Sequence, residues 1–399
     1  MKIIFMNWDS YGNEDILDAF DELKKNGEDI TVVKYPFANT EKRHDEKFEN
    51  DFRAKLEEEK ADLVFSFNYY PLISKTVQSV YDAIGTRYVS WVYDCPHISL
   101  YSYTLINKCN DVFIFDSTMY FTFAKQGIET VHFLPMAASV RRLDALTVTP
   151  DIWQRFQARI GFVGGLYTEQ HTFYDRMEGK LDDYTKGYLE GAMRAQMKVD
   201  GVNFMEDIIT PRIHDGMQKA MPLSPNADGV ESTQFMYAQY FLNRKITQTE
   251  RSEIFRMIGK HYPMSLYTRD KTFVAEGVRV HGPVDYFREF PLVVKCTDIN
   301  LNVTLRSIVT GIPMRIFDMM GAGGFVLTNY QSDLLEFFTP GEDFVYYESR
   351  EDLLAKLDYY LAHDDERRKI AASGHDKIAQ AHTFDHRVRE ILDIVLNRR

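Results

Sequence analysis

The chain has 399 residues, 45% of them hydrophobic and 27% charged, which is the composition of a globular protein large enough for two or three domains. Its formal net charge of −12 argues against a nucleic-acid-binding protein, because such a protein needs a basic face to displace counterions, and against strong attachment to anionic lipid. The three cysteines, Cys95, Cys109 and Cys296, include no Cys-x-x-Cys pair, and the first residues read as a strand rather than a signal peptide, so we expect a cytoplasmic protein. No stretch of 18 apolar residues is present, so we expect no transmembrane segment.

Strands and helices alternate along the first part of the chain. Short apolar runs, typical of buried strands, occur at residues 2–6, 30–35, 63–67, 87–93, 112–115 and 131–134. Stretches with helical periodicity lie between them. Such alternation predicts a parallel sheet with helices on both faces. We therefore expect residues 1–150 to form a Rossmann-like domain.

Polar residues follow several of these strands, and ligands of parallel sheets bind beyond the carboxyl ends of the strands. Asp94 ends an apolar strand and precedes Cys95–Pro96, so it is the first candidate for a general base, with His97 the second. Asp9 and Asp116 end other strands and are candidates for binding acceptor hydroxyls. Each has a plainer reading as well: an aspartate at a strand end often caps the next helix, and a single histidine is more often a structural hydrogen-bonding group.

A second domain is predicted over residues 159–383, after a crossing segment at 136–158. Its first strand, 159–163, is followed at once by Gly164 and Gly165. A glycine pair there either lets the backbone approach a phosphate closely or simply makes a tight turn. Residues 169–261 contain no convincing strand, and runs at 184–199 and 235–262 have helical periodicity. We interpret this stretch as a helical insertion that shapes the acceptor site, forms a homodimer contact or adds scaffold.

The strand–helix alternation resumes at 264–267 and 278–281. An apolar approach at 290–294 leads into a strand that ends near Asn300, and a short amphipathic helix at 314–320 ends at glycines before a strand at 325–327. A last strand is predicted at 343–346, followed by helices at 349–361 and 364–381. A final helix is predicted at 384–397.

Residues 295–330 hold the residue types of a nucleotide diphosphate site. Arg315 and Asp318 share one face of the predicted 314–320 helix. A helix N-terminus offers free N–H groups to phosphates, arginine offers a charged donor fork, and a carboxylate accepts from ribose hydroxyls. Arg306 is a second candidate for the diphosphate, and Asn300 and Asn302 are candidates for phosphate or sugar. The alternative for Arg315 and Asp318 is an ordinary surface ion pair.

The segment RIFDMMGAGGFVLTN resembles the donor-site motif Arg-x-Phe-Glu-x-x-x-x-Gly-Gly of GT-B glycosyltransferases. The residues after it, up to about 390, and the loop FVGGLY resemble the CgeB-like (spore maturation protein) group of that superfamily; the likeness is weaker over 1–165. The chain has Asp318 where the family usually has Glu, and Thr310 where many retaining enzymes carry another Glu. The resemblance implies two Rossmann-like domains facing a cleft, with the donor in the C-terminal domain. It also implies that the final helix, 384–397, crosses back onto the first domain.

These observations predict a glycosyltransferase of hexosyltransferase type that moves a sugar from a nucleotide diphosphate sugar, with UDP favoured as the common donor. No Asp-x-Asp motif is present, so we expect no metal and no cofactor. The acceptor is a saccharide, a protein or a small molecule. A GT-B-shaped nucleotide-sugar 2-epimerase and a non-catalytic sugar-nucleotide-binding protein are the alternatives. The predicted donor-binding residues are Gly164, Gly165, Tyr167, Asn300, Asn302, Arg306, Arg315, Asp318, Gly323 and Gly324.

Overall fold

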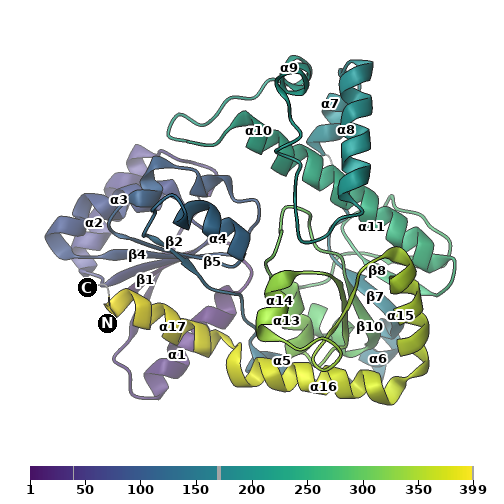
Figure 1. Ribbon diagram of the computed structural model, residues 1–399. Helices are drawn as coiled ribbons and strands as arrows, with labels where there is room; N and C mark the ends of the chain where they lie inside the picture. Colours follow the sequence, from purple (N-terminus) through teal and green to yellow (C-terminus); the bar gives the residue numbers. More distant parts are fainter. Residues whose placement is uncertain (39, 169–171, 398–399) are drawn as a thin grey trace. The chain divides into compact units, whose positions relative to one another are not determined.

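The computed structural model describes residues 1–38, 40–168 and 172–397 (Figure 1). The chain forms two compact units. Unit 1 is built from Met1–Ala137, Pro225–Glu231 and the chain from His382 onward, and unit 2 from Ala138–Ser224 and Ser232–Ala381.

Unit 1 contains a six-stranded parallel sheet with the strand order β2-β1-β3-β4-β5-β6. The central strands are buried along their whole length, as expected where helices cover both faces. The predicted parallel sheet is thus confirmed. Its strands are β1 (Lys2–Asn7), β2 (Thr31–Pro36), β3 (Leu63–Phe67), β4 (Arg87–Val92), β5 (Asn110–Ile114) and β6 (Val131–Phe133).

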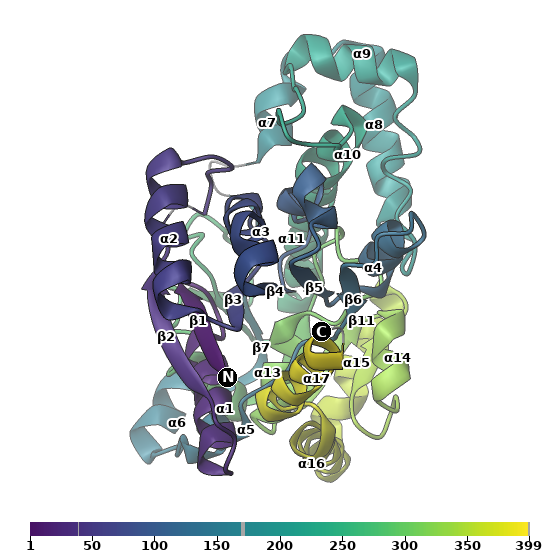
Figure 2. The same ribbon diagram turned by 90° about the vertical axis from the view of Figure 1, so that its left-hand side faces the viewer.

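Helices cover both faces of this sheet. The apolar sides of α2 and α3 pack on one face with Ile4 and Val64. On the other face α1 lies beside the C-terminal helix α17, as Figures 1 and 2 show, and Phe384 of α17 packs against Trp91 with ring centroids 5.7 Å apart. The helices are α1 (Asn13–Lys25), α2 (Glu46–Glu59), α3 (Pro71–Ile84), α4 (Ser117–Ala124) and α17 (Phe384–Asn397), with 3-10 turns η1 (Ile98–Leu100) and η2 (Tyr103–Ile106).

Unit 2 contains a second six-stranded parallel sheet, in the order β12-β11-β10-β7-β8-β9. Its strands alternate with helices along the chain, and their apolar side chains form one core with the helices α11, α15 and α16. The prediction of two Rossmann-like α/β domains is therefore confirmed. The strands are β7 (Ala158–Val163), β8 (Met264–Tyr267), β9 (Val278–His281), β10 (Thr297–Asn302), β11 (Val326–Asn329) and β12 (Val345–Tyr347).

The apolar approach at residues 290–294 does lead into a strand, β10, as expected. The approach itself is the helix α12, which has Pro291 in its first turn, where a missing N–H costs nothing. Unit 2 also contains α5 (Val140–Ala145), α6 (Pro150–Phe156), α11 (Asn243–Gly259), α12 (Phe290–Lys295), α13 (Met314–Gly321), α14 (Ser332–Phe337), α15 (Arg350–Ala362) and α16 (Asp364–Ala381).

The helical insertion has a core of its own, in which Met177, Leu189 and Met217 pack around Tyr237. Both ribbon views show α7, α8 and α9 standing away from the sheet of unit 2 (Figures 1 and 2). The insertion ends earlier than residue 261, because Ile254 and Phe255 of α11 belong to the sheet core. Residues 169–171 lie outside the described residues. The insertion consists of α7 (Phe173–Glu178), α8 (Asp183–Gln196), α9 (Pro211–Ala220), α10 (Thr233–Met236) and the π-helix η3 (Tyr237–Leu242).

The boundaries of the units differ from the predicted ones. Unit 1 ends at Ala137 rather than at residue 150, because α5 and α6 pack in unit 2, where Phe156 contacts Tyr267. The loop Pro225–Glu231, expected inside the insertion, belongs to unit 1, where Asp228 pairs with Arg43 at 3.1 Å. None of the described helices is long and apolar enough to cross a bilayer.

Candidate functional site

The loops that follow the strands of unit 2 meet at the carboxyl edge of its sheet, where ligands of parallel sheets bind. Along this edge the strand order β9-β8-β7-β10-β11 sets the order of the loops. The loop after β9 carries Tyr286, the loop after β7 carries Gly164 and Gly165, and the loops after β10 and β11 line a small pocket.

Gly164 is required by the close approach of Arg315. A Cβ at position 164 would lie 2.3 Å from Nη1 of Arg315, and the backbone has a φ of 155°. Arg315, in the first turn of α13, donates from Nη1 to the carbonyl of Val163, and its guanidinium lies 5.0 Å from the centroid of Phe162. The predicted glycine loop and the predicted helix N-terminus are thus in direct contact.

A second arginine, Arg251 of α11, lies on the same aromatic ring. Its guanidinium is 5.1 Å from the centroid of Phe162 and 5.2 Å from that of Tyr167. It donates to the carbonyl of Val303, with Nε at 3.0 Å, and to the carbonyl of Gly165. Arg251 is 2% exposed, so its guanidinium is held inside unit 2. We call Arg251 and Arg315 the arginine pair.

The arginine pair is a buried positive site. Within the described residues neither arginine forms an ion pair with a carboxylate, although the charge of Glu250 opposes the effect of burial on the pKa of Arg251. Burial and the neighbouring Arg251 lower the pKa of Arg315 to about 9, and burial also lowers the pKa of Arg251. Since guanidinium stays protonated in proteins, these shifts mean that two charged groups are held at an energetic cost that a bound anion would relieve. Tyr167 adds a non-glycine φ of 59°, a strained conformation of the kind that gathers at functional sites.

Arg306 does not occupy the position that the sequence suggested. Its Nε donates to Glu250 at 2.8 Å, its Nη2 pairs with the same carboxylate, and its Nη1 pairs with Asp200 and donates to the carbonyl of Val199. Burial disfavours this cation, but Glu250 and Asp200 outweigh burial and raise the pKa of Arg306 above its ordinary value. Arg306 therefore connects the insertion to the loop after β10. Because its N–H groups are already engaged by these partners, its guanidinium has no pair of N–H groups available for a diphosphate.

Asp318 is 1% exposed and accepts a hydrogen bond of 2.7 Å from the hydroxyl of Tyr286, in the loop after β9. The surface ion pair with Arg315, which was the alternative reading, is not formed. The carboxylate therefore faces the loop that precedes α12, whereas the guanidinium of Arg315 contacts the end of β7. Its predicted role toward a ribose stays a prediction.

Four predicted donor residues have structural roles within the fold. Asn300 donates to the carbonyl of Val294 at 3.3 Å, and Asn302 donates to Thr304 and Thr328 inside the sheet edge. Gly323 ends α13 with a φ of 76°, and a Cβ on Gly324 would lie 2.4 Å from a methyl of Val294. Both glycines lie at the C-terminal end of α13, about 12 Å from its first turn, because eight residues rise 1.5 Å each. Their packing explains these residues without a ligand.

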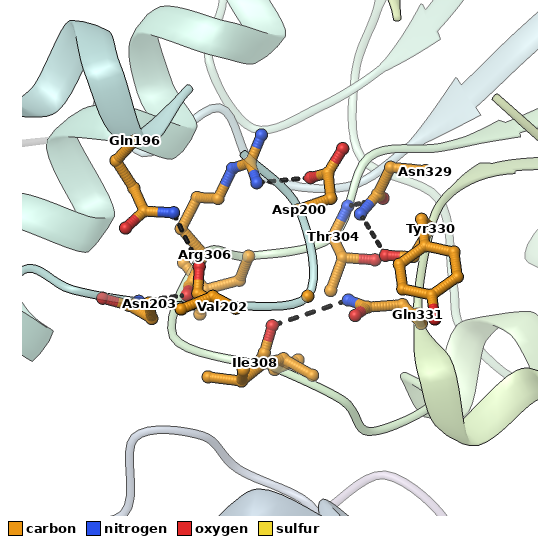
Figure 3. Close-up of a pocket in the computed structure, with 13 residues that line it drawn as sticks. Gln196, Asp200, Val202, Asn203, Thr304, Arg306, Ile308, Asn329, Tyr330 and Gln331 are labelled. Atoms are coloured by element: carbon orange, nitrogen blue, oxygen red, sulfur yellow. Dashed lines mark hydrogen bonds and ion pairs between the residues drawn. The ribbon is translucent and has the colours of Figure 1, made fainter. Parts of the chain in front are cut away.

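A polar pocket opens at the carboxyl ends of β10 and β11 (Figure 3). One wall comes from residues 304–309 and 329–331, and the other from residues 196–203 of the insertion. Asn329 Oδ1 accepts the N–H of Thr304 at 2.8 Å, which fixes the loop after β10. The cavity measures about 10 Å³, the space that a single water requires.

Asp94 stands at the carboxyl end of β4 in unit 1 and is held by Asn68. Nδ2 of Asn68 donates to Asp94 Oδ2 at 2.7 Å, while Oδ1 accepts the N–H groups of Tyr93 and Asp94. Asn68 has a φ of 59°, a strained backbone conformation for a residue other than glycine. In this conformation its side-chain amide points toward Asp94. The Asp94 side chain is exposed.

The other candidates of unit 1 are His97, Asp116 and Asp9; two of them lie in loops and one caps a helix. His97 Nε2 lies 2.9 Å from the carbonyl of Tyr69, and burial lowers the pKa of His97 although Asp94 opposes this, so the ring is neutral at pH 7. Asp116 accepts the N–H of Met119 at 2.7 Å and is the N-cap of α4, the plainer of its two readings. Asp9 is exposed in the loop after β1.

Sequence reasoning missed Arg251, Asn68, Tyr286 and Asp200. Arg251 had a signal: it lies four residues after Thr247 and four before Phe255, both buried, so an arginine occupies the apolar face of α11. A charged residue on such a face needs a partner or a ligand. Asn68 directly follows the buried strand β3, a position at which the sequence analysis selected only aspartates and a histidine.

Comparisons with known proteins bear on the fold of the chain. Residues 240–393 match a family model described as "Glycosyl transferase-like", whereas no curated protein sequence matches the chain. The fold resembles a glycosyltransferase from Rickettsia africae, with a TM-score of 0.53 at 11% identity over 100% of this chain and 98% of that one. It also resembles HepE from Anabaena in complex with UDP-glucose (0.54, 10%, all of both chains) and sucrose-phosphate synthase from Thermosynechococcus elongatus (0.53, 9%, all of both chains). At these identities the likeness establishes the fold.

Proposed function

We propose that this chain, whose fold is that of the GT-B glycosyltransferases, transfers a sugar from a nucleotide diphosphate sugar to an acceptor. The superfamily resemblance read from residues 295–390 is confirmed, and the CgeB-like group stays a prediction. UDP is the favoured donor nucleotide. The solved structure of HepE contains UDP-glucose, which supports this choice for the present chain.

The observation that carries the proposal is the arginine pair. When a glycosyl bond to a diphosphate breaks, negative charge develops on the departing phosphate oxygen, and fixed positive groups stabilise that charge. On this proposal Arg315 donates directly to the diphosphate, together with the first N–H groups of α13. Arg251, which lies near the same Phe162 ring, adds positive potential without contacting the ligand. On this proposal the guanidinium charges do the work for which other enzymes use a divalent cation.

Asp94 is the proposed general base. The acceptor oxygen attacks the anomeric carbon, the bond from that carbon to the diphosphate breaks, and the acceptor proton passes to the Asp94 carboxylate. Asn68 positions the carboxylate by binding Oδ2 and the neighbouring backbone. His97, neutral and bound to Tyr69, is a positioning residue for the same turn.

A thermal-shift panel of UDP, ADP, GDP and dTDP tests the donor site. We expect one diphosphate, UDP by preference, to raise the melting temperature, because a ligand that binds only the folded state stabilises it by mass action. In Arg315→Ala the affinity should fall roughly 10- to 100-fold, the equivalent of a lost hydrogen bond to a charged group of about 1.5–3 kcal/mol. The exposed Arg279→Ala on β9 is the matched control and should behave as the parent. A panel without any shift would end the proposal.

A second assay separates transfer from the alternatives. Release of UDP from a UDP-sugar that depends on an added acceptor supports transfer. Conversion of the sugar without release of UDP would instead support a 2-epimerase, and tight binding without either reaction would support a non-catalytic binding protein.

A further inference from the structure

The loop Pro225–Glu231 belongs to the insertion in sequence, because it lies between α9 and α10, but it packs in unit 1. The N–H of Val230 donates to the carbonyl of Tyr101 at 2.9 Å. The carbonyl of Asp228 accepts from the N–H of Tyr103 at 3.1 Å. The backbone of the loop is therefore joined to the segment of unit 1 that contains the 3-10 turns η1 and η2.

The carboxylate of Asp228 binds the same segment at two places. Its Oδ1 accepts from Nη1 of Arg43 at 3.1 Å, and its Oδ2 accepts from the hydroxyl of Ser102 at 2.9 Å. Nη2 of Arg43 donates in turn to the carbonyl of Ile98 at 3.1 Å. Asp228 therefore holds residues 98–102 at both ends, at one end through Arg43 and at the other directly.

A series of contacts joins this segment to the proposed general base. The residue before Ile98 is His97, whose Nε2 lies 2.9 Å from the carbonyl of Tyr69. The residue before Tyr69 is Asn68, which donates to Asp94 at 2.7 Å. A shift of Ile98 would therefore reach the carboxylate of the base through two hydrogen bonds.

The charge of Arg43 also acts on His97. Burial lowers the pKa of His97, the charge of Asp94 opposes burial, and the charge of Arg43 adds to it. Because a Coulomb interaction weakens with distance, an arginine with this influence lies near the ring. The Asp228 carboxylate, which pairs with Arg43, thus places a cation beside the turn that carries the proposed base.

The shape of the loop does not depend on the side chain of Asp228. Glu231 is 3% exposed, and its Oε1 accepts from the backbone N–H and from Nδ2 of Asn226, at 2.8 and 2.7 Å. The Glu231 carboxylate also occupies the space where a side chain of Gly229 would begin. Glu231 therefore folds the loop, while Asp228 connects it to the rest of unit 1. A variant that lacks the Asp228 carboxylate tests this connection without unfolding the loop.

We infer that Asp228 is a positioning residue for the acceptor side of the transfer reaction: through Arg43 and Ser102 it fixes the segment that follows the proposed base. The inference rests on the proposed function and deepens it, because it gives the helical insertion a part in the reaction. Asp228 acts by keeping the Asp94 turn in one orientation. Orientation matters at such a site, since a displacement of a reacting group by about 1 Å can cost about 100-fold in rate.

Hydrogen–deuterium exchange of the full chain tests the connection without any substrate. In Asp228→Ala the amides of residues 98–104 should exchange several-fold faster than in the parent, because local opening becomes easier when a segment loses its anchor. The amides of β4 and β5 should keep their parental rates. Val230→Ala is the matched control, since its side chain is 55% exposed and its backbone N–H still donates to Tyr101. Parental exchange of residues 98–104 in Asp228→Ala would overturn the inference.

Release of UDP from UDP-glucose, to water or to the acceptor that the transfer assay identifies, tests the role in the reaction. In Asp228→Ala kcat should fall about 10- to 100-fold, while the affinity for UDP stays parental because the arginine pair lies in unit 2. In an Asp94→Asn background the same change should cost nothing further, because Asp228 acts through Asp94. Asp228→Asn, which keeps the shape and one acceptor oxygen, should recover part of the loss.

The remaining outcomes separate the inference from the proposed function. A parental kcat in Asp228→Ala, or losses that multiply in the double variant, would overturn the inference and leave the proposed function intact. Failure of every nucleotide diphosphate to bind the parent protein would instead remove the proposed function, and the part of Asp228 in the reaction with it, whatever the exchange rates show.

Discussion

At the scale of single residues, Asp94 and Arg315 owe their suitability to neighbours rather than to their own chemical type. The Asp94 carboxylate is exposed to water, but the hydrogen bond from Asn68 fixes its orientation. Arg315 is an ordinary arginine whose cation is made costly by burial and by Arg251. In both cases the preorganisation is present without a ligand, which is the condition for stabilising charge at the moment of reaction.

Replacing Asp94 by asparagine tests the general base. Asp94→Asn keeps the size and most of the hydrogen bonding but removes the proton acceptor, so kcat should fall about 10²- to 10⁴-fold with little change in the thermal shift by UDP. Steady-state release of UDP measures the first quantity and the nucleotide panel the second. Asp82→Asn, an exposed aspartate of α3, is the control. Unchanged turnover in Asp94→Asn would remove Asp94 from its role.

At the scale of elements, the donor site depends on how closely β7 and α13 approach each other. Gly164 directly follows β7, and the guanidinium of Arg315 on α13 occupies the space where a side chain would begin. Neither element forms the site alone: the strand supplies the Val163 carbonyl and the helix supplies the cation.

Gly164→Ala therefore has a specific expected result. The new methyl would overlap Nη1 of Arg315 and strain a backbone of positive φ, so the protein should lose about 1–3 kcal/mol of stability and most of its response to UDP. Denaturant unfolding and the thermal shift measure the two effects. Gly191→Ala in α8 has open space around it and should leave the UDP response intact. A Gly164→Ala protein with the parental UDP shift would show that this approach is not part of the donor site.

At the scale of the whole chain, unit 1 is completed by residues from the far end of the sequence. Phe384 of α17 packs on Trp91 and also lies 3.4 Å from the position of a Cβ on Gly12, next to the loop that carries Asp9. The N-terminal 137 residues alone therefore lack one layer of their own core.

Phe384→Ala should destabilise unit 1 by about 3–5 kcal/mol, because it removes a fully buried aromatic ring. Denaturant unfolding followed by tryptophan fluorescence reports on this layer, since Trp91 is the packing partner. Leu396→Ala, on the same helix but 42% exposed, should change the stability by no more than about 0.5 kcal/mol. Equal stability of the two variants would mean that α17 is not part of the unit 1 core.

The sequence by itself determined the two parallel sheets, because buried strands and amphipathic helices leave periodic patterns that do not depend on distant residues. It also singled out Asp94, Gly164 and Arg315 as candidates, since each lies at or next to the end of such an element, where the sheet brings polar groups together. Only the tertiary structure revealed the ion pairs of Arg306 and the position of Arg251. The partners of Arg306, Glu250 and Asp200, lie 56 and 106 residues away, and the lowered pKa of the arginine pair comes from burial. Neutralisation and desolvation are properties of the packed molecule, because both depend on which side chains are brought together in space.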